Sequence, residues 1–171
     1  MVDKLCGELK AYRYKVDDRM ELTPGFKFND WEMRGIPLRI EIGPKDVAKS
    51  SVVLARRDIP GKEGKSSAML QGIEKEVGDM LSKIQQSLYQ KAVEFRDAHI
   101  HQPGDYDELK EIVTNGWAFA PWCGSAECEN NVKEETKATI RCIPLDQPHE
   151  AGACICCGKP ATQKVYFAKA Y

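Results

Sequence analysis

The chain has 171 residues, enough for one large domain or two small ones with a buried core. Charged residues make up 30% of it, yet the formal net charge is −1, which excludes a globally basic coat for nucleic acid. The N-terminus lacks the apolar core of a secretory signal and no segment approaches a transmembrane span, so we expect a cytoplasmic protein without a membrane partner.

The first residues predict a helix followed by an exposed strand. Apolar side chains within 2–10 recur at helical spacing, and residues 12–16 alternate between apolar and charged side chains. Thr23-Pro24-Gly25 can then start a short helix over 26–34, which Gly35 ends. Because an α/β sheet usually begins with a strand, a chain that begins in a helix indicates a missing first strand, and we expect a longer parent protein.

Two further strands and a long helix follow. Residues 37–43 alternate with a period of two, and 52–55 form a continuous apolar run, typical of a buried strand. Residues 59–67 are polar and contain glycine, so we expect a linker there. Apolar side chains from 70 to 88 at spacings of three and four predict an amphipathic helix that packs on the sheet. The fold class is therefore α/β, with a mixed sheet flanked by helices.

The C-terminal part predicts a second, smaller α/β domain. Asp105 with Glu108 three residues later forms a capping box, and Asn115-Gly116 closes the helix that it starts. Residues 117–120 predict a strand. We place the domain boundary near residue 100, which gives domains of residues 1–100 and 101–171.

Four cysteines in this second domain form two close pairs, one spaced Cys-x4-Cys and the other Cys-x2-Cys. They are Cys123, Cys128, Cys154 and Cys157. Each pair supplies two thiolates from one turn, which is what a tetrahedral Zn²⁺ site needs. Four thiolates leave no open coordination position, so the sequence predicts a structural zinc site.

Other interpretations of the cysteines remain open. The count of seven is odd, which argues against a disulfide framework, and a reducing compartment favours metal or redox roles. A redox Cys-x-x-Cys pair normally opens a helix, whereas here it runs into Gly158-Lys159-Pro160. Cys156 could replace a member of the second pair as ligand, although two intervening residues suit a zinc knuckle better than one.

The run PGFKFNDWEMRGIPLRIEIGPKD, residues 24–46, is the most informative segment outside the cysteines. Together with Asp17-Asp18-Arg19 before it and 53–58 after it, this run closely resembles the anticodon-binding domain of archaeal/eukaryotic-type prolyl-tRNA synthetases. The cysteine pattern and the ending 165–171 resemble the C-terminal zinc-binding extension of that family. The resemblance covers essentially the whole chain.

The resemblance implies that five side chains read the anticodon of tRNA(Pro), which ends in two guanines. They are Phe28, Glu32, Arg39, Glu41 and Lys45. A carboxylate accepts from guanine N1–H and N2–H₂, and an arginine fork donates to O6 and N7. An aromatic ring can stack on an unstacked base, and a lysine can reach phosphate or O6. The alternative interpretation is that Phe28 is a core residue and that Arg39 and Glu41 form an ordinary surface salt bridge.

The resemblance also implies a parent enzyme that joins proline to tRNA(Pro) with ATP on a class II catalytic domain. We find no motif of that domain here, so we expect a catalytically silent C-terminal fragment that binds RNA rather than DNA. The carboxylate of Tyr171 is expected to face the catalytic domain. The alternatives are a stand-alone zinc-binding RNA or protein adaptor without an enzymatic parent, and a thiol redox protein with a low-pKa cysteine.

Overall fold

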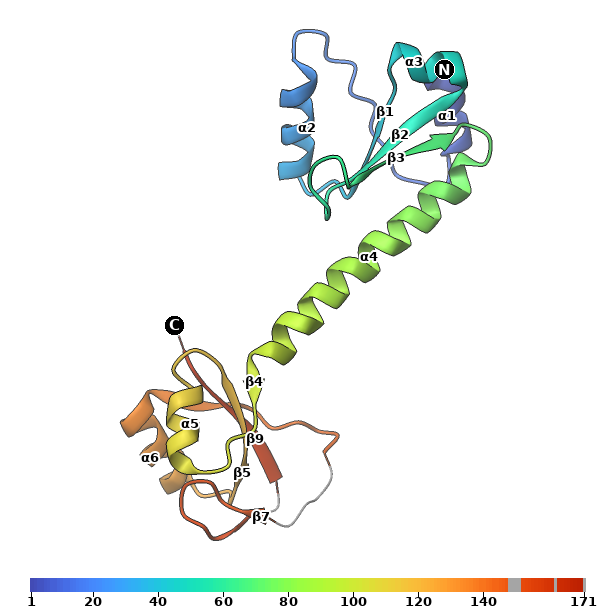
Figure 1. Ribbon diagram of the computed structural model, residues 1–171. Helices are drawn as coiled ribbons and strands as arrows, with labels where there is room; N and C mark the ends of the chain where they lie inside the picture. The colour runs from blue at the N-terminus through green and yellow to red at the C-terminus, as the bar shows by residue number, and fades with distance from the viewer. Residues whose placement is uncertain (148–151, 162, 171) are drawn as a thin grey trace. The chain divides into compact units, whose positions relative to one another are not determined.

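The computed structural model describes residues 1–147, 152–161 and 163–170 (Figure 1). Within them the chain folds as two compact units, Met1–Lys91 and Ala92–Tyr171, and the division falls inside the long helix α4 (Ile73–Ala98). Each unit has its own sheet and its own core, and together they confirm the mixed α/β class. Among the described residues, no helix combines the length and the apolar character that crossing a membrane requires.

The unit Met1–Lys91 contains a three-stranded antiparallel sheet in the order β1-β2-β3. Its elements are α1 (Val2–Glu8), α2 (Pro24–Met33), β1 (Leu38–Glu41), α3 (Pro44–Lys49), β2 (Ser51–Arg56), β3 (Lys65–Met69) and the first part of α4. One face of the sheet is apolar: Val52 and Leu54 of β2 pack with Leu5 of α1 and Ile73 of α4. These side chains are buried, and they form the core of this unit.

The other face of the same sheet is polar because side chains alternate along each strand. The antiparallel register pairs Arg39 with Ala55 and Ala55 with Lys65, so these three residues form one row across β1, β2 and β3. Glu41 lies two residues beyond Arg39 and therefore points to the same face. The sheet thus places two cations and a carboxylate on one surface, separated by a small side chain.

Two sequence-based expectations for this unit were wrong. No strand forms over 12–16 in the described part of the chain, because alternation indicates half-burial but supplies no hydrogen-bonding partner; Tyr14 and Val16 are exposed. The expected linker over 59–67 contains the start of β3 instead. Polar residues are tolerated there because β3 is an edge strand whose one face is exposed.

The irregular segment before α2 is held to that helix by ion pairs, which we call the Asp17 clasp (Asp17, Arg19, Asp30 and Trp31). Asp17 accepts hydrogen bonds from Arg19 Nη2 at 2.7 Å and Trp31 Nε1 at 2.8 Å. Arg19 Nη2 also donates to Asp30 at 3.0 Å. The bonds from Arg19 hold the pKa of Asp17 well below its usual range, against the opposing effect of desolvation. The clasp therefore fixes α2 from the side of the preceding chain.

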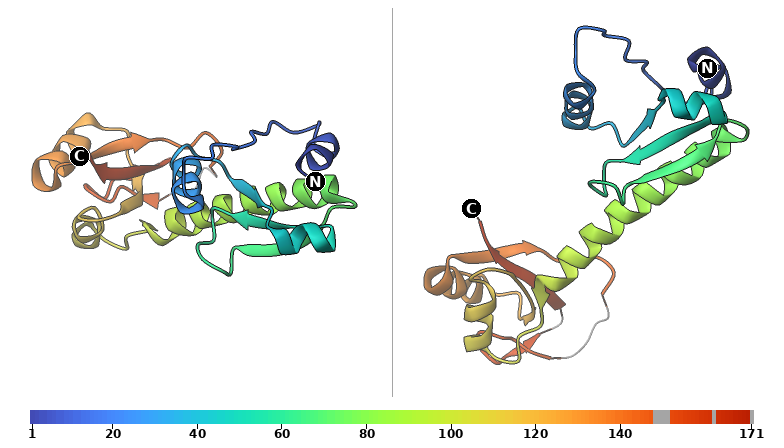
Figure 2. Two further views of the ribbon diagram at one scale, coloured as in Figure 1. Left: turned by 90° about the horizontal axis from the view of Figure 1, so that it is seen from above. Right: turned by 45° about the horizontal axis from the view of Figure 1, so that its top comes forward.

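The unit Ala92–Tyr171 has a four-stranded sheet in the order β4-β5-β9-β6, in which only the β4–β5 pair is parallel among the described strands. Its remaining elements are β4 (Ile100–His101), α5 (Tyr106–Ile112), β5 (Trp117–Trp122), α6 (Ala126–Thr136), β6 (Ala138–Cys142), β7 (Gly152–Ala153), β8 (Pro160–Ala161) and β9 (Gln163–Lys169). Val165 and Phe167 of β9 are buried with Leu109 of α5 and Val132 of α6. Figure 2 shows the ribbon of the chain in two further views. One half of the expected capping box is present, since Asp105 Oδ1 accepts from Glu108 N at 2.8 Å, whereas Glu108 Oε2 accepts from Gly104 N at 2.6 Å instead of from Asp105 N.

We predict that Asp17→Ala loosens the segment 11–22 and α2 without unfolding the sheet, because the mutation removes the acceptor that Arg19 and Trp31 share. Amide hydrogen exchange should become faster in those two regions and stay unchanged in β2. Asp18→Ala is the matched control, since the neighbouring Asp18 is exposed. An exchange pattern that is the same in both variants would show that the clasp does not hold α2.

Candidate functional site

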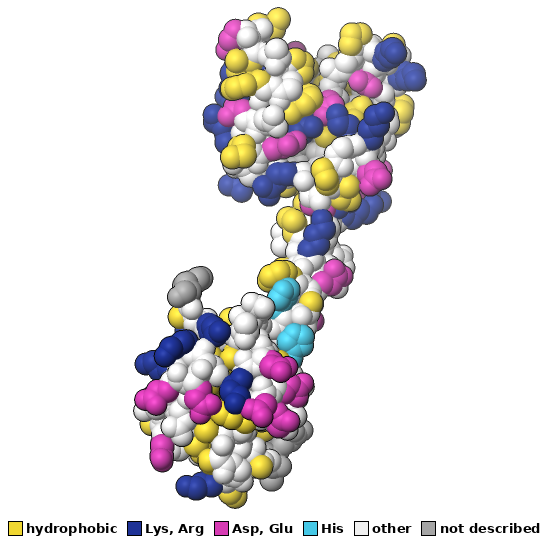
Figure 3. Space-filling view, turned by 60° about the vertical axis from the view of Figure 1, so that its left-hand side comes forward, with side chains coloured by type: hydrophobic (Ala, Val, Ile, Leu, Met, Phe, Trp, Pro, Cys, Tyr) yellow, Lys and Arg dark blue, Asp and Glu magenta, His cyan; other side chains and the backbone are white. Residues whose placement is uncertain are grey.

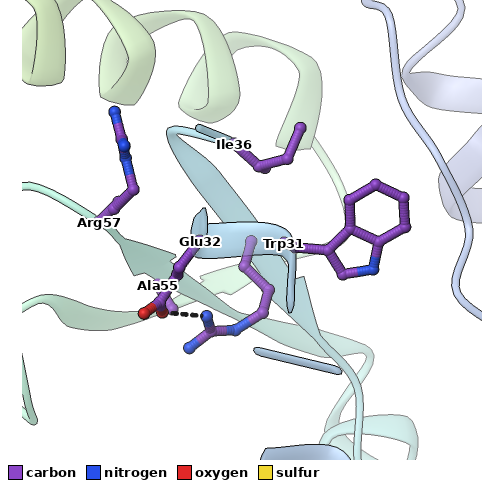
Figure 4. A pocket seen from close by; sticks show the side chains of 6 residues that line it. Trp31, Glu32, Ile36, Ala55 and Arg57 are labelled. Atoms are coloured by element: carbon purple, nitrogen blue, oxygen red, sulfur yellow. Dashed lines mark hydrogen bonds and ion pairs between the residues drawn. The ribbon is translucent and has the colours of Figure 1, made fainter. Parts of the chain in front are cut away.

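Arg39 is the centre of a cluster on the polar face of the first sheet. Its Nη1 donates to Glu32 Oε1 of α2 at 2.5 Å, and its Nε donates to Glu41 Oε1 of β1 at 3.0 Å. Figure 4 shows the Glu32 carboxylate at the end of the dashed line that marks the first of these ion pairs. The pair thus joins helix α2 to strand β1, and it leaves a guanidinium donor and a carboxylate acceptor side by side.

An aromatic ring lies under this arginine. The Cζ atom of Arg39 is 4.0 Å from the centroid of the Phe28 ring, and Lys65 Nζ is 5.6 Å from the same centroid. Both distances are within the range of a cation–π interaction. Phe28 is half-buried, so its ring supports the guanidinium and is still partly accessible to solvent.

Lys65 belongs to the same cluster, although its sequence context predicted only a linker. Its Nζ lies 2.9 Å from each oxygen of Glu41. Burial raises the pKa of Glu41, but the hydrogen bonds from Lys65 and Arg39 more than offset it, and the net pKa is lowered. The signal for Lys65 is its register opposite Ala55, and this becomes visible only once β3 is known to pair with β2. We call Phe28, Glu32, Arg39, Glu41 and Lys65 the Arg39 cluster.

The structure does not bring Lys45 into the Arg39 cluster. This residue lies in the first turn of α3, where Gly43 is the N-cap and its N–H donates to Asp46 Oδ2 at 2.8 Å. The side chain of Lys45 is exposed and has no hydrogen bond or ion pair with any residue that the structure describes. It is therefore a free cation on a neighbouring helix.

Two adjacent arginines differ sharply in their surroundings. Arg56 Nη2 lies 2.6 Å from Asp58 Oδ2, and the Asp58 side chain is only 1% exposed, so this pair belongs to the fold. Arg57 is exposed and forms no ion pair within the described ranges. A small hollow beside it is lined by Trp31, Glu32, Ile36, Arg39, Ala55 and Arg57 (Figure 4).

The surface around these residues mixes both signs of charge. On the face that Figure 3 shows, Lys and Arg side chains lie among Asp and Glu side chains and apolar ones.

The second candidate site is a group of four cysteines in the unit Ala92–Tyr171. The Sγ atoms of Cys123, Cys128, Cys154 and Cys157 all lie within 4.8 Å of one another. The distance between the sulfur atoms is 3.6 Å for Cys123–Cys128 and 3.8 Å for Cys123–Cys157. A tetrahedral ion with metal–sulfur bonds of about 2.3 Å separates its ligands by about 3.8 Å, whereas a disulfide needs about 2.05 Å. The group fits a metal ion and excludes a disulfide between these cysteines.

Local backbone structure points these sulfurs inward. Cys123 follows β5, Cys128 lies in α6, and Cys154 begins the turn after β7, where Gly158 N donates to Cys154 O at 2.9 Å. Gly158 has a φ of 70°, a conformation that favours glycine. Burial raises the pKa of the Cys154 thiol, but backbone N–H groups of the same turn more than offset it and lower the pKa to about 7. The turn therefore favours the thiolate, which is the form that binds metal.

The neighbouring Cys156 lies outside this group of four. It packs against the two hydrophobic clusters of the unit, and burial is the main cause that raises the pKa of its thiol. A protonated, partly buried thiol is a small apolar side chain. Cys142, at the end of β6, is exposed and is also outside the group. Tyr171, expected to face a catalytic domain, lies outside the described residues.

Comparisons with known proteins give a consistent result over nearly the whole chain. Residues 1–86 match the family described as "Anticodon binding domain", and residues 106–171 match the family "Prolyl-tRNA synthetase, C-terminal". A proline–tRNA ligase of Roseiflexus castenholzii is 53% identical over 99% of this chain, and the chloroplastic/mitochondrial proline–tRNA ligase of Arabidopsis thaliana is 49% identical over 93% of it.

A solved structure gives the same answer. The crystal structure of prolyl-tRNA synthetase from Cryptosporidium parvum, complexed with L-proline and AMP, superposes with a TM-score of 0.91 at 30% identity and covers 99% of this chain. The chain spans only about a third of these proteins: 36% of the Roseiflexus ligase and 36% of the Cryptosporidium chain. The similarity therefore concerns the C-terminal region of this family.

Proposed function

Because the chain belongs to the prolyl-tRNA synthetase family, matching its C-terminal region, we propose that it binds the anticodon of tRNA(Pro) for a catalytic domain that joins proline to the tRNA with ATP. Residues 1–100 would form the anticodon-binding domain and residues 101–171 the zinc-binding domain. We further propose a cytoplasmic location, where reducing conditions keep cysteine thiols free for metal.

The observation that carries this proposal is the contact between Arg39 and Glu32. Along its exposed edges guanine presents two acceptors, N7 and O6, followed by two donors, N1–H and N2–H₂. The matching protein surface must present N–H donors next to a carboxylate oxygen that is still able to accept, as Glu32 Oε2 is among the described residues. An arginine fork beside a carboxylate provides that order, and their 2.5 Å ion pair keeps the two groups adjacent.

The remaining side chains fit supporting roles in binding RNA. The half-buried ring of Phe28 can stack on a splayed-out base of the anticodon loop. Lys45 and Arg57 are exposed cations without ion pairs among the described residues, so each is available for a phosphate oxygen. Glu41 and Lys65 complete the Arg39 cluster. We propose all of these positions as parts of the anticodon site.

We propose Zn²⁺ as the metal held by Cys123, Cys128, Cys154 and Cys157. Four thiolates at tetrahedral spacing are the ligand set of structural zinc sites. When bound, the ion supplies a cross-link and no catalytic chemistry, because no coordination position stays open. The four cysteines would connect β5 and α6 to the turn after β7.

We predict that Arg39→Ala weakens binding of a tRNA(Pro) anticodon stem-loop by about 1–3 kcal/mol, or roughly 5- to 150-fold. The reason is the loss of the fork that reads O6 and N7. Glu32→Gln should weaken binding as well, because an amide replaces one of the acceptor oxygens. Fluorescence anisotropy with the wild-type stem-loop and with guanine-to-adenine variants measures both effects.

Lys49→Ala is the control for the loss of one positive charge, since Lys49 is exposed on α3 and outside the Arg39 cluster. It should weaken all stem-loops slightly and leave the preference for guanine unchanged. If Arg39→Ala and Glu32→Gln both bind the proline anticodon as tightly as the unmodified chain does, the proposed reading surface is wrong.

We predict about one Zn²⁺ per chain by mass spectrometry of metals, and about none in Cys154→Ser. Chelation should speed hydrogen exchange in α6 and β9 and leave β2 of the other unit unchanged, because the metal cross-links only the C-terminal unit. Cys142→Ser is the matched control and should keep the metal, since Cys142 is exposed and outside the group. A metal-free chain with normal exchange in α6 would contradict the zinc proposal.

A further inference from the structure

We propose that Glu41 does not touch the RNA and is instead the residue that positions Arg39 and Lys65, so that Glu32 is the carboxylate that reads guanine. This inference rests on the proposed function and divides the roles of two carboxylates that the sequence treats alike. It follows from how many hydrogen bonds each carboxylate already makes, and from where each one lies.

The oxygens of Glu41 are already occupied. Oε1 accepts from Arg39 Nε at 3.0 Å and from Lys65 Nζ at 2.9 Å, and Oε2 accepts from Lys65 Nζ at 2.9 Å. The side chain is 21% exposed. To bind a base, Glu41 would have to give up charge-assisted bonds with two cations, which are among the stronger hydrogen bonds in proteins.

Glu32 is in the opposite situation. Its side chain is 42% exposed, and only Oε1 has a partner among the described residues, the Nη1 of Arg39. Oε2 is left to accept from the N2 amino group of a guanine. Because Glu32 lies on α2, it approaches Arg39 from a different element than Glu41 does. The two carboxylates therefore hold different sides of one guanidinium.

The sheet explains why a positioning carboxylate is needed. Arg39 and Lys65 lie in one row on either side of Ala55, so two cations share the same face. Glu41, on the same face of β1, bridges them. Without it the cations would repel each other, and no group would hold Nε of Arg39.

Anchoring Nε sets the direction of the arginine fork. With Nε bonded to Glu41, the Nη2 atom has no hydrogen-bond partner within the described part of the chain and can donate to a base. A bidentate contact with O6 and N7 requires a fixed guanidinium plane, and the Phe28 ring 4.0 Å from Cζ supports that plane. Glu41 thus acts on RNA through Arg39 and Lys65.

The test compares Glu41→Gln with Glu32→Gln on anticodon stem-loops that carry guanine or inosine at each of the two guanine positions in turn. Inosine lacks only the N2 amino group that a carboxylate would accept from. Glu32→Gln should reduce the preference for guanine over inosine to near unity at one position. Glu41→Gln should weaken both RNAs by the same factor, about tenfold, and keep the preference.

A double-mutant cycle provides the second readout. In an Arg39→Ala background, Glu41→Gln should cost much less than it does alone, because Glu41 acts through that arginine. Glu41→Asp, which retains the charge but shortens its reach, should show the same uniform loss and replaces Glu41→Gln if that variant does not fold by circular dichroism.

Two results would overturn the inference. One is a loss of the guanine preference in Glu41→Gln, which would place Glu41 on the base; the other is unchanged affinity for both RNAs. Failure of the proposed function looks different, since the unmodified chain would then show no preference for the proline anticodon at all.

Discussion

The guanidinium of Arg39, held between carboxylates from two elements, is the constraint on which the first unit's surface depends. Its bond to Glu32 joins α2 to β1, its bond to Glu41 lies within β1, and its contact with Phe28 fixes α2 from a second point. The Asp17 clasp holds α2 from the preceding segment. A helix without a buried side chain of its own is thereby kept in place by polar and cation–π contacts. The residues proposed to bind RNA are therefore partly the same as those that hold α2 in place.

In the second unit, the segment of interest is the turn after β7, where cysteine sulfurs from three parts of the chain meet. The sheet of this unit has an apolar core against which Ile155 and Cys156 of the turn after β7 also pack, and that turn links the two strands of the short β7–β8 ladder. Four sulfurs bring this turn to β5 and α6. Backbone hydrogen bonds and the packing of Ile155 and Cys156 already hold this turn, and the proposed metal ion would add a cross-link from it to β5 and α6.

The structural features that could be predicted from the sequence are those encoded within a few neighbouring residues. The capping of α5 by Asp105 and the apolar run of β2 act over a few residues, and both were predicted correctly. The convergence of Cys123 with Cys157 follows from ligand chemistry and spacing. Strand partners are not local: residues 12–16 had the pattern of a strand without a partner, and Lys65 joined the cluster only because β3 pairs with β2. The register that makes Lys65 a neighbour of Glu41 is absent from any short stretch of sequence.

Ala55 is the uncharged residue in the row that it forms with Arg39 and Lys65 across the first sheet. It is buried, and its single methyl group lies between two long cationic side chains. A valine or leucine there would fill the space over which Arg39 and Glu32 meet, and would do so without altering any charge. For the proposed base-reading surface, the volume of the side chain at position 55 is therefore a constraint separate from charge, and a larger residue there would disturb Arg39 and Glu32 before any polar group is exchanged.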